Sequence, residues 1–261
     1  MSTLKSLYAL IKIKTKACSA IALTAALTLA GCGGGPGTDS ESIWVADNAG
    51  VLGYVNVSTG EQTVVGEMGT VMTDIAFDSA GNLYGITFGD LYSIDRVTAV
   101  PTLIGTHNDG TGAKNSLVFD VDNTLYAAWG GLYTIDVTTG VSTVLGNGGT
   151  SYQSSGDLAF VDGDLYMSSS VAGEDDSLVI LDTVDGSASE VGSMGIKPAY
   201  GLSYNKSALY SVAGTDIYTT NTETGESTLV SSYEVIDVEP SEEPVVTLGI
   251  AYGTAFYGEA K

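Results

Sequence analysis

Acidic and amide side chains recur at short spacing in the stretch FDSAGNLYGITFGDLYSID, residues 77–95. Asp78 and Asn82 flank a glycine, and Asp90 and Asp95 follow in the same segment. Oxygen donors at this spacing could bind Ca²⁺, which needs six to eight oxygen ligands around one point. The same residue types also favour hairpins, because Asp, Asn and Gly tolerate the backbone angles of a tight turn. The stretch is therefore either a metal loop or a turn between two strands.

An internal repeat runs through most of the chain. The segment DIAFDSAGNLYGITFGDLYSIDRVTAVPTLIG begins at residue 74, and related copies begin at residues 116, 157 and 201, with a partial copy from residue 249. Each full copy contains four short segments of alternating apolar and polar residues, separated by Gly, Asn, Asp and Thr, which is typical of strands and hairpins. Four strands per unit of about 40 to 45 residues predict an all-β fold, a β-propeller of four-stranded antiparallel blades.

The two ends of the repeat region complete the count of blades. Ile43–Gly66 matches the last three strands of a unit, and Leu248–Gly253 matches a first strand. Their pairing would close the ring with five blades and leave no free edge between the first and last. We therefore expect a propeller domain over residues 43–261. One conflict remains, since Ile43–Ala46 and Ala255–Tyr257 both match the second strand of the closing blade.

The repeats resemble secreted bacterial β-propellers of the broad NHL/SMP-30-like type, with the pattern LYxIDxxTG. The resemblance covers residues 43–258 and implies the fold, but it implies no particular function, because propellers carry enzymes, lectins and scaffolds alike.

Alignment of the copies favours the turn interpretation of the opening stretch. The position of Asp78 is taken by Asp120, Val161 and Asn205 in the other copies, and that of Asn82 by Thr124, Asp164 and Ala208. One copy thus lacks an oxygen donor at each position, whereas a hairpin needs only residues that tolerate its backbone angles. A second set of Asp and Asn residues follows the third strand of each unit and is expected to form Asx-type hairpins: Asn56, Asp95, Asp136, Asp182 and Asn221.

The amino terminus has the form of a signal peptide over residues 1–31. Its basic part carries Lys5, Lys12, Lys14 and Lys16, and Ala17–Ala30 is an apolar run too short to span a bilayer stably. The run ends in Leu29-Ala30-Gly31-Cys32, which resembles the bacterial lipobox. That resemblance implies cleavage before Cys32 and acylation of this residue, palmitate included. The residue directly after the cysteine is Gly33. In lipoproteins, an aspartate at this position favours retention in the inner membrane, so Gly33 implies transfer to the outer membrane. Residues 32–42 then form the lipidated cysteine and a flexible tether.

Loss of this leader changes both the cysteine count and the charge. Cys18 leaves with the leader and Cys32 carries lipid, so the domain has no thiol for disulfides, metal ligation or nucleophilic catalysis. Five Lys and Arg then stand against 31 Asp and Glu. A protein this acidic repels nucleic acid, so we expect no nucleic-acid partner. We expect no cofactor and a monomer.

Loop lengths distinguish the two faces of the predicted propeller. Turns from first to second and from third to fourth strand are short, whereas all the long insertions fall on the opposite face. Long loops on a rigid face are where binding is usually carried. The candidate ligand-face aromatics, which could stack on a sugar or pack against a protein, are Phe88, Trp129, Tyr152, Tyr200 and Tyr233. The alternative for Trp129 is that it only packs against its own blade.

Two groups of carboxylates define the alternatives. Asp74 and Asp157 begin first strands, nearest the axis, and a carboxylate pair is the minimum for glycoside hydrolysis. These aspartates could equally bond backbone amides of a neighbouring blade. Glu234, Asp237 and Glu239 lie in an acidic loop that is either solvated or a loose cation site.

The sequence thus predicts a membrane-anchored outer-membrane lipoprotein, periplasmic or surface-exposed, whose non-catalytic propeller binds a protein partner or a glycan. The alternatives are a glycan-active hydrolase that uses Asp74 and Asp157, and a calcium-dependent adhesion module.

Overall fold

The computed structural model describes residues 35, 37–107, 110, 113–170, 172–235 and 246–260. The chain divides into two units, Met1–Gly33 and Gly34–Lys261, and every described residue lies in the second. Cys32, the signal peptide, Asp237 and Glu239 lie outside the described residues. Among the residues that are described, no helix is long and apolar enough to cross a membrane.

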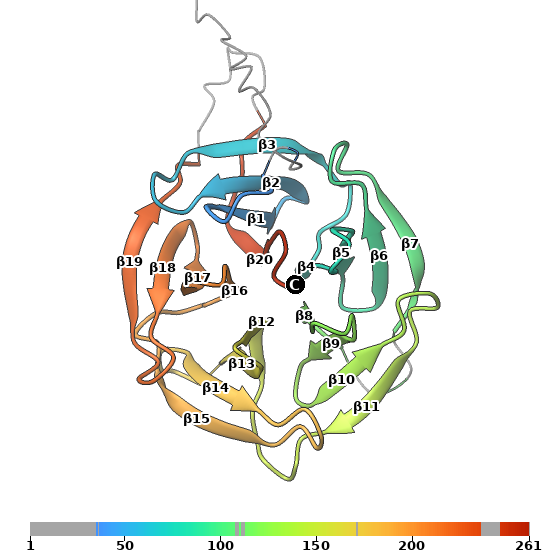
Figure 1. Cartoon of the computed structure of the whole chain (residues 1–261), viewed down its shortest axis with the longest axis vertical. Coiled ribbons are helices and arrows are strands. Elements are labelled where there is room, and N and C mark those ends of the chain that lie inside the picture. Colours follow the sequence, from blue (N-terminus) through green and yellow to red (C-terminus); the bar gives the residue numbers. More distant parts are fainter. Residues whose placement is uncertain are drawn as a thin grey trace, which may run out of the picture. The chain divides into compact units, whose positions relative to one another are not determined.

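In the part of the chain that the structure describes, twenty strands form five sheets of four antiparallel strands each, so the predicted five-bladed propeller is confirmed. Figure 1 shows the blades arranged as a ring, with one strand of each blade near the axis and one at the rim. The inner strands are β4 (Asp74–Phe77), β8 (Ser116–Phe119), β12 (Ser154–Val161), β16 (Gly201–Tyr204) and β20 (Ala251–Phe256).

The remaining strands follow outward from the axis in sequence order. The second strands are β1 (Ser42–Asp47), β5 (Leu83–Ile86), β9 (Leu125–Ala128), β13 (Asp164–Ser169) and β17 (Leu209–Ala213). The third strands are β2 (Val51–Asn56), β6 (Asp90–Ile94), β10 (Leu132–Ile135), β14 (Ser177–Leu181) and β18 (Asp216–Thr220). The outer strands are β3 (Gln62–Glu67), β7 (Pro101–Thr106), β11 (Ser142–Gly146), β15 (Ala188–Ser193) and β19 (Ser227–Ser232).

The closing blade uses both ends of the chain, in a register that differs from the expected one. Strand β20 is the inner strand and pairs with β1, Ile43 opposite Phe256 and Ala46 opposite Gly253. The segment GTAF, residues 253–256, therefore occupies the position of DIAF in β4, four residues later than the match that began at residue 249. Ile43–Ala46 keeps the second strand, and Ala255 and Phe256 belong to the first strand. The conflict between them disappears once the register is shifted.

Aromatic side chains pack each blade against the next. The second-strand aromatic of one blade packs against the first-strand Phe of its neighbour, with ring centroids 5.1–5.5 Å apart in four pairs: Trp44–Phe77, Tyr84–Phe119, Tyr126–Phe160 and Tyr210–Phe256. Tyr166, which has the same place in its blade, is buried in a cluster with Leu202 and Leu209. The tyrosines of the second strands are thus blade-packing residues.

The short turns are held by their own Asp and Asn side chains. Asp78 accepts hydrogen bonds from the backbone N–H of Asn82 at 2.8 Å and from its side-chain amide at 2.7 Å. After the third strand, Asp95 accepts from the N–H groups of Val97 and Thr98. The same Asx pattern occurs at Asn56, Asp136, Asp182 and Asn221. The opening stretch is therefore three strands and their turns, in which the carboxylates of Asp78 and Asp95 accept backbone N–H groups.

The chain enters the propeller on the short-turn face. Strand β1 is a second strand, and second strands begin at the turn that follows the first strand. The residues before β1 contact that end of the molecule: Trp44 donates its indole N–H to the carbonyl of Gly37 at 2.7 Å, and Asn205 donates to the carbonyl of Ser40 at 2.8 Å. The last part of the segment expected to be a tether is thus docked on the propeller from Gly37 onward.

Candidate functional site

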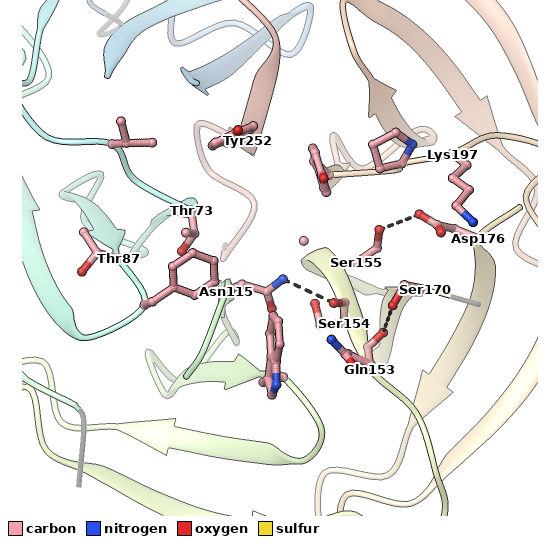
Figure 2. Close-up of a pocket in the computed structure, with 16 residues that line it drawn as sticks. Thr73, Thr87, Asn115, Gln153, Ser154, Ser155, Ser170, Asp176, Lys197 and Tyr252 are labelled. Carbon is pink, nitrogen blue, oxygen red and sulfur yellow. Dashed lines mark hydrogen bonds between the residues drawn. The ribbon is translucent and has the colours of Figure 1, made fainter. Parts of the chain in front are cut away.

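A cavity of about 530 Å³ lies at the axis on the long-loop face (Figure 2). Its walls come from the segments that enter the first strands, such as Thr73 and Asn115, and from second-to-third turns, such as Phe88 and Trp129. All five blades contribute to this face because the inner strands converge on the axis. The volume falls within the roughly 300–1,000 Å³ of small-molecule sites.

Two aromatic pairs face this cavity. Phe88 and Trp129, from the second-to-third turns of adjacent blades, meet edge to face with centroids 6.1 Å apart and planes at 89°. Tyr200 and Tyr252 form a second edge-to-face pair, 5.5 Å apart at 82°. Phe88 is 55% exposed, which is high for a phenylalanine, and Trp129 is half-buried. An edge-to-face pair stabilises the position of each ring and leaves ring surface available for a ligand.

Polar side chains occupy the rest of the wall. Asn115 donates its amide to the carbonyl of Ser154 at 3.3 Å, and Ser155 donates its hydroxyl to Asp176 at 2.5 Å (Figure 2). Asp176 is 1% exposed and also accepts the N–H of Ala199 at 2.8 Å. Among the described residues, two buried wall atoms have no hydrogen-bond partner, the Oδ1 of Asn115 and the Oγ of Ser154. Such atoms are rare in folded proteins and carry a free-energy cost that a bound ligand can remove.

The five predicted aromatics fall in different environments. Phe88, Trp129 and Tyr200 line the cavity. Tyr152 is half-buried, packs in the core of its blade and donates its hydroxyl to the carbonyl of Gly186 at 2.8 Å, while burial raises its pKa to about 12. Tyr233 is 2% exposed and donates to the carbonyl of Gly249 at 2.9 Å. It is a core residue, so the expectation that it faces a ligand does not fit its position.

Sequence reasoning missed Tyr252, Asn115 and Ser154. The match of Leu248–Gly253 to a first strand, which is four residues out of register, places Tyr252 at the position of Phe77. In the structure, Tyr252 is near the start of β20 and lines the cavity. Asn115 lies in the long connection before β8, and Ser154 is the first residue of β12, in a stretch that the sequence pattern assigns to a long loop. Nothing in the local pattern separates a polar wall residue from a solvated one there.

The axial pair Asp74 and Asp157 is wholly buried, with 0% exposure for each, and neither lines the cavity. Each carboxyl group accepts a backbone N–H from the next blade, Leu117 to Asp74 at 2.5 Å and Leu202 to Asp157 at 2.6 Å. Asp157 also accepts the hydroxyl of Thr254 at 2.9 Å. These contacts match the structural interpretation, in which first-strand aspartates join neighbouring blades.

Burial governs the ionisation of this pair. It raises the pKa of Asp74 well above its usual range, and the charge of Asp157 raises it further. Burial also raises the pKa of Asp157, while the hydrogen bond from Asp74 and backbone N–H groups act in the opposite direction. Burial is therefore the main reason why both carboxyl groups have a pKa above the usual range, and each lies close enough to affect the ionisation of the other.

A third carboxyl group lies on the short-turn side of this pair. Glu259 is partly buried and accepts the backbone N–H groups of Tyr204 at 3.0 Å and Phe256 at 3.3 Å. Burial raises its pKa to about 8, and backbone hydrogen bonds limit the shift. Nothing in the repeat pattern indicated this residue, because Glu259 follows the last strand and has no counterpart in the other copies.

The acidic loop, which we expect to be either solvated or a loose cation site, lies only partly within the described residues. Glu234 is exposed, and its backbone carbonyl accepts the side-chain amide of Gln62 at 2.6 Å. Asp237 and Glu239 lie outside the described residues. Within the described ranges, no group of three or more His, Cys, Asp and Glu side chains is placed to hold a metal ion.

Comparison with known proteins supports the fold alone. No protein-family model and no curated protein sequence matches the chain. Among solved structures, the chain is similar to a structural-genomics protein of unknown function from Bacteroides thetaiotaomicron, at 18% identity and a TM-score of 0.55. That match covers 85% of this chain and 63% of the other, so the chain spans less than two thirds of the length of this relative. A second match, at 19% identity and a TM-score of 0.47, covers 73% of this chain and 90% of a protein described under "The de novo evolutionary emergence of a symmetrical protein is shaped by folding constraints".

Proposed function

We propose that the chain is a non-catalytic envelope lipoprotein, anchored in the outer membrane through acylated Cys32, whose propeller binds a protein partner or a glycan in the cavity on its long-loop face. The observation that carries the proposal is the composition of that cavity. Two aromatic pairs leave ring surface open to it, and two buried polar atoms of its wall, on Asn115 and Ser154, have no partner among the described residues. Both features are costly without a ligand.

The place where the chain enters the propeller supports this arrangement. Thr38 and Ser40 line a second cavity, of about 290 Å³, together with Asn205 and Glu259 on the short-turn face. The six residue-to-residue steps from Cys32 to Thr38 span at most about 22 Å when fully extended. An anchor on Cys32 would therefore hold the short-turn face toward the membrane, and the aromatic cavity would open away from it.

The hydrolase alternative has no specific observation in its favour. A catalytic carboxylate must reach the substrate, and both Asp74 and Asp157 are wholly buried with their oxygens bonded to backbone N–H groups.

Site-specific photocrosslinking in intact cells tests the binding face. We expect a photoreactive phenylalanine analogue at position 88 to form adducts with one protein or glycan. The matched control is the same analogue at Val184, which is 83% exposed in a third-to-fourth turn on the opposite face. Adducts at position 184 alone, or at neither position, would remove the support for ligand binding on the long-loop face.

Labelling with radioactive palmitate tests the anchor separately. The full chain is expected to incorporate the label and to sediment with outer membranes, and Cys32→Ala is expected to lose both properties. Incorporation that persists in Cys32→Ala would refute the lipobox assignment and leave the binding proposal untouched.

A further inference from the structure

Among the described residues, the charged groups in the wall of the aromatic cavity are already hydrogen-bonded to the protein. The wall contains one carboxylate and one ammonium group, those of Asp176 and Lys197. The Oδ2 of Asp176 already accepts two hydrogen bonds, from Ser155 and Ala199. Lys197 donates to the carbonyl of Glu174 at 2.6 Å. A charged ligand would have to compete with these bonds, whereas an uncharged one leaves them in place.

The two partnerless wall atoms restrict the ligand further. The Oδ1 of Asn115 is an acceptor and needs a donor, whereas the Oγ of Ser154 can donate or accept. The two residues are 6% and 2% exposed, so water satisfies them poorly. A carboxylate could not serve Asn115, because it only accepts. An ammonium group could donate to both atoms, but neither atom carries a charge that would offset the cost of burying it. A hydroxyl group does both, and small rotations of these short side chains would bring it within bonding distance of either.

The aromatic pairs surround the cavity from two different parts of the ring of blades. Phe88 belongs to the blade β4–β7, and Trp129 belongs to the adjacent blade β8–β11. Tyr200 immediately precedes β16, and Tyr252 is in β20 of the closing blade. Asn115 precedes β8 and Ser154 begins β12, so both lie away from the tyrosine pair. The matching ligand therefore has a flat apolar surface for the rings and a polar edge for the amide and hydroxyl. A sugar ring has this form, with C–H groups on its faces and hydroxyl groups around its edge.

We propose that the cavity binds a neutral saccharide ring, the terminal unit of a glycan, stacked on Trp129 or Tyr252 with a hydroxyl group bonded to Asn115 and Ser154. This inference rests on the proposed ligand-binding function and names the chemical class of the ligand.

Tryptophan fluorescence provides a direct test, because the chain has two tryptophans in contrasting positions. Trp129 lines the cavity and Trp44 is 1% exposed. In the full chain carrying Trp44→Phe, purified in detergent, acrylamide quenching reports on Trp129 alone. The probes are glucose, galactose, mannose, N-acetylglucosamine and their neutral oligomers. The comparators are glucuronate, choline and a neutral peptide.

At least one neutral saccharide is expected to shield Trp129 with saturation, and the comparators are not. Asn115→Ala should weaken this binding about five- to tenfold, and Tyr252→Ala about tenfold or more. Val184→Ala, on the opposite face, should leave the affinity unchanged. Trp129→Phe, which retains only the buried Trp44, should show no saccharide-dependent shielding.

Three results would overturn the saccharide assignment. The first is shielding of Trp129 by choline, glucuronate or the peptide but by no neutral saccharide, and the second is shielding by none of the probes. The third is saccharide binding that Asn115→Ala and Tyr252→Ala leave intact. Specific adducts at position 88 in the crosslinking experiment would, in each case, preserve the broader ligand-binding function. Loss of both the shielding and the adducts would refute the two proposals together.

Discussion

Replacement of Asp157 by alanine separates the structural role of the axial carboxylates from a catalytic one. The Asp157 side chain is fully buried and accepts the N–H groups of Leu158 at 2.7 Å and Leu202 at 2.6 Å, together with the hydroxyl of Thr254. Leu202 belongs to β16, the inner strand of the next blade, and Thr254 belongs to β20, the inner strand of the blade after that. Asp157→Ala therefore leaves the N–H groups of Leu158 and Leu202 without this acceptor in a buried place, and it removes one of the two acceptors of the Thr254 hydroxyl.

The magnitude follows from the two backbone groups that lose their partner. A buried donor left unsatisfied costs roughly 1–3 kcal/mol, so the two N–H groups together cost about 2–6 kcal/mol. This is a large part of the roughly 5–15 kcal/mol that stabilises an ordinary domain. With a urea dependence of about 2 kcal/mol per molar, the midpoint of unfolding should fall by about 1–3 M.

Urea unfolding of the full chain, followed by circular dichroism, measures this shift. Asp95→Ala is the matched control, because Asp95 also accepts two backbone N–H groups, those of Val97 and Thr98, in an exposed turn. Water can replace the carboxylate there, so the control should lose about 1 kcal/mol or less. If Asp157→Ala were no less stable than Asp95→Ala, the assignment of Asp157 as a joint between blades would be refuted, and a role in catalysis would have to be considered again.

Three other outcomes follow from the structure. Burial raises the pKa of Glu259 to about 8, so the stability linked to its proton is complete below about pH 4.5 and is lost as the pH rises through about 8. Between pH 5 and pH 9, the free energy of unfolding of the wild type should thus fall by about 4 kcal/mol more than that of Glu259→Gln. Thermal melting at both pH values measures this difference, and parallel melting curves would contradict the shift. Tyr233→Ala should lower the free energy of unfolding by about 3–5 kcal/mol, as expected for a buried aromatic residue. Tyr233→Phe should lower it by about 1 kcal/mol and leave ligand binding unchanged. Weaker binding by a fully stable Tyr233→Phe would show that this residue belongs to the ligand-binding face. Removal of Ca²⁺ with EGTA should leave the melting temperature unchanged, and a clear fall would support the calcium-dependent alternative.

The sequence by itself determined the blades, their number and their turns. Successive side chains of a strand point to opposite faces of the sheet, so apolar residues at every second position indicate a strand. Each repeat also carries its own turn-forming Asp or Asn, such as Asp95, within a few residues of the backbone N–H groups that it accepts. These signals are local, or they recur at a constant spacing, and both kinds can be found in a one-dimensional pattern. The loop asymmetry that placed Phe88, Trp129 and Tyr200 on one face follows in the same way, from strand direction alone.

Only the tertiary structure decided the register of the closing strand. The segments GIAY and GTAF both alternate well enough to serve as β20, and pairing with β1 selects the second. The selection depends on contacts between the two ends of the chain, more than 200 residues apart. The shift of four residues moves Tyr252 out of the assigned strand position and to the cavity, and it places Gly253 against Asp74.

The environment of each candidate site residue was likewise decided in three dimensions. Tyr233 is in a long connection, as Tyr200 is, yet its ring turns into the core formed with Val55 and Leu248, whereas the ring of Tyr200 faces the cavity. Asp74 and Asp157 bond N–H groups about 40 residues further along the chain, which the ring of blades brings to the axis. The burial of a residue and its hydrogen-bond partners depend on residues that are distant in the sequence. The pattern of residues along one strand does not identify these distant neighbours.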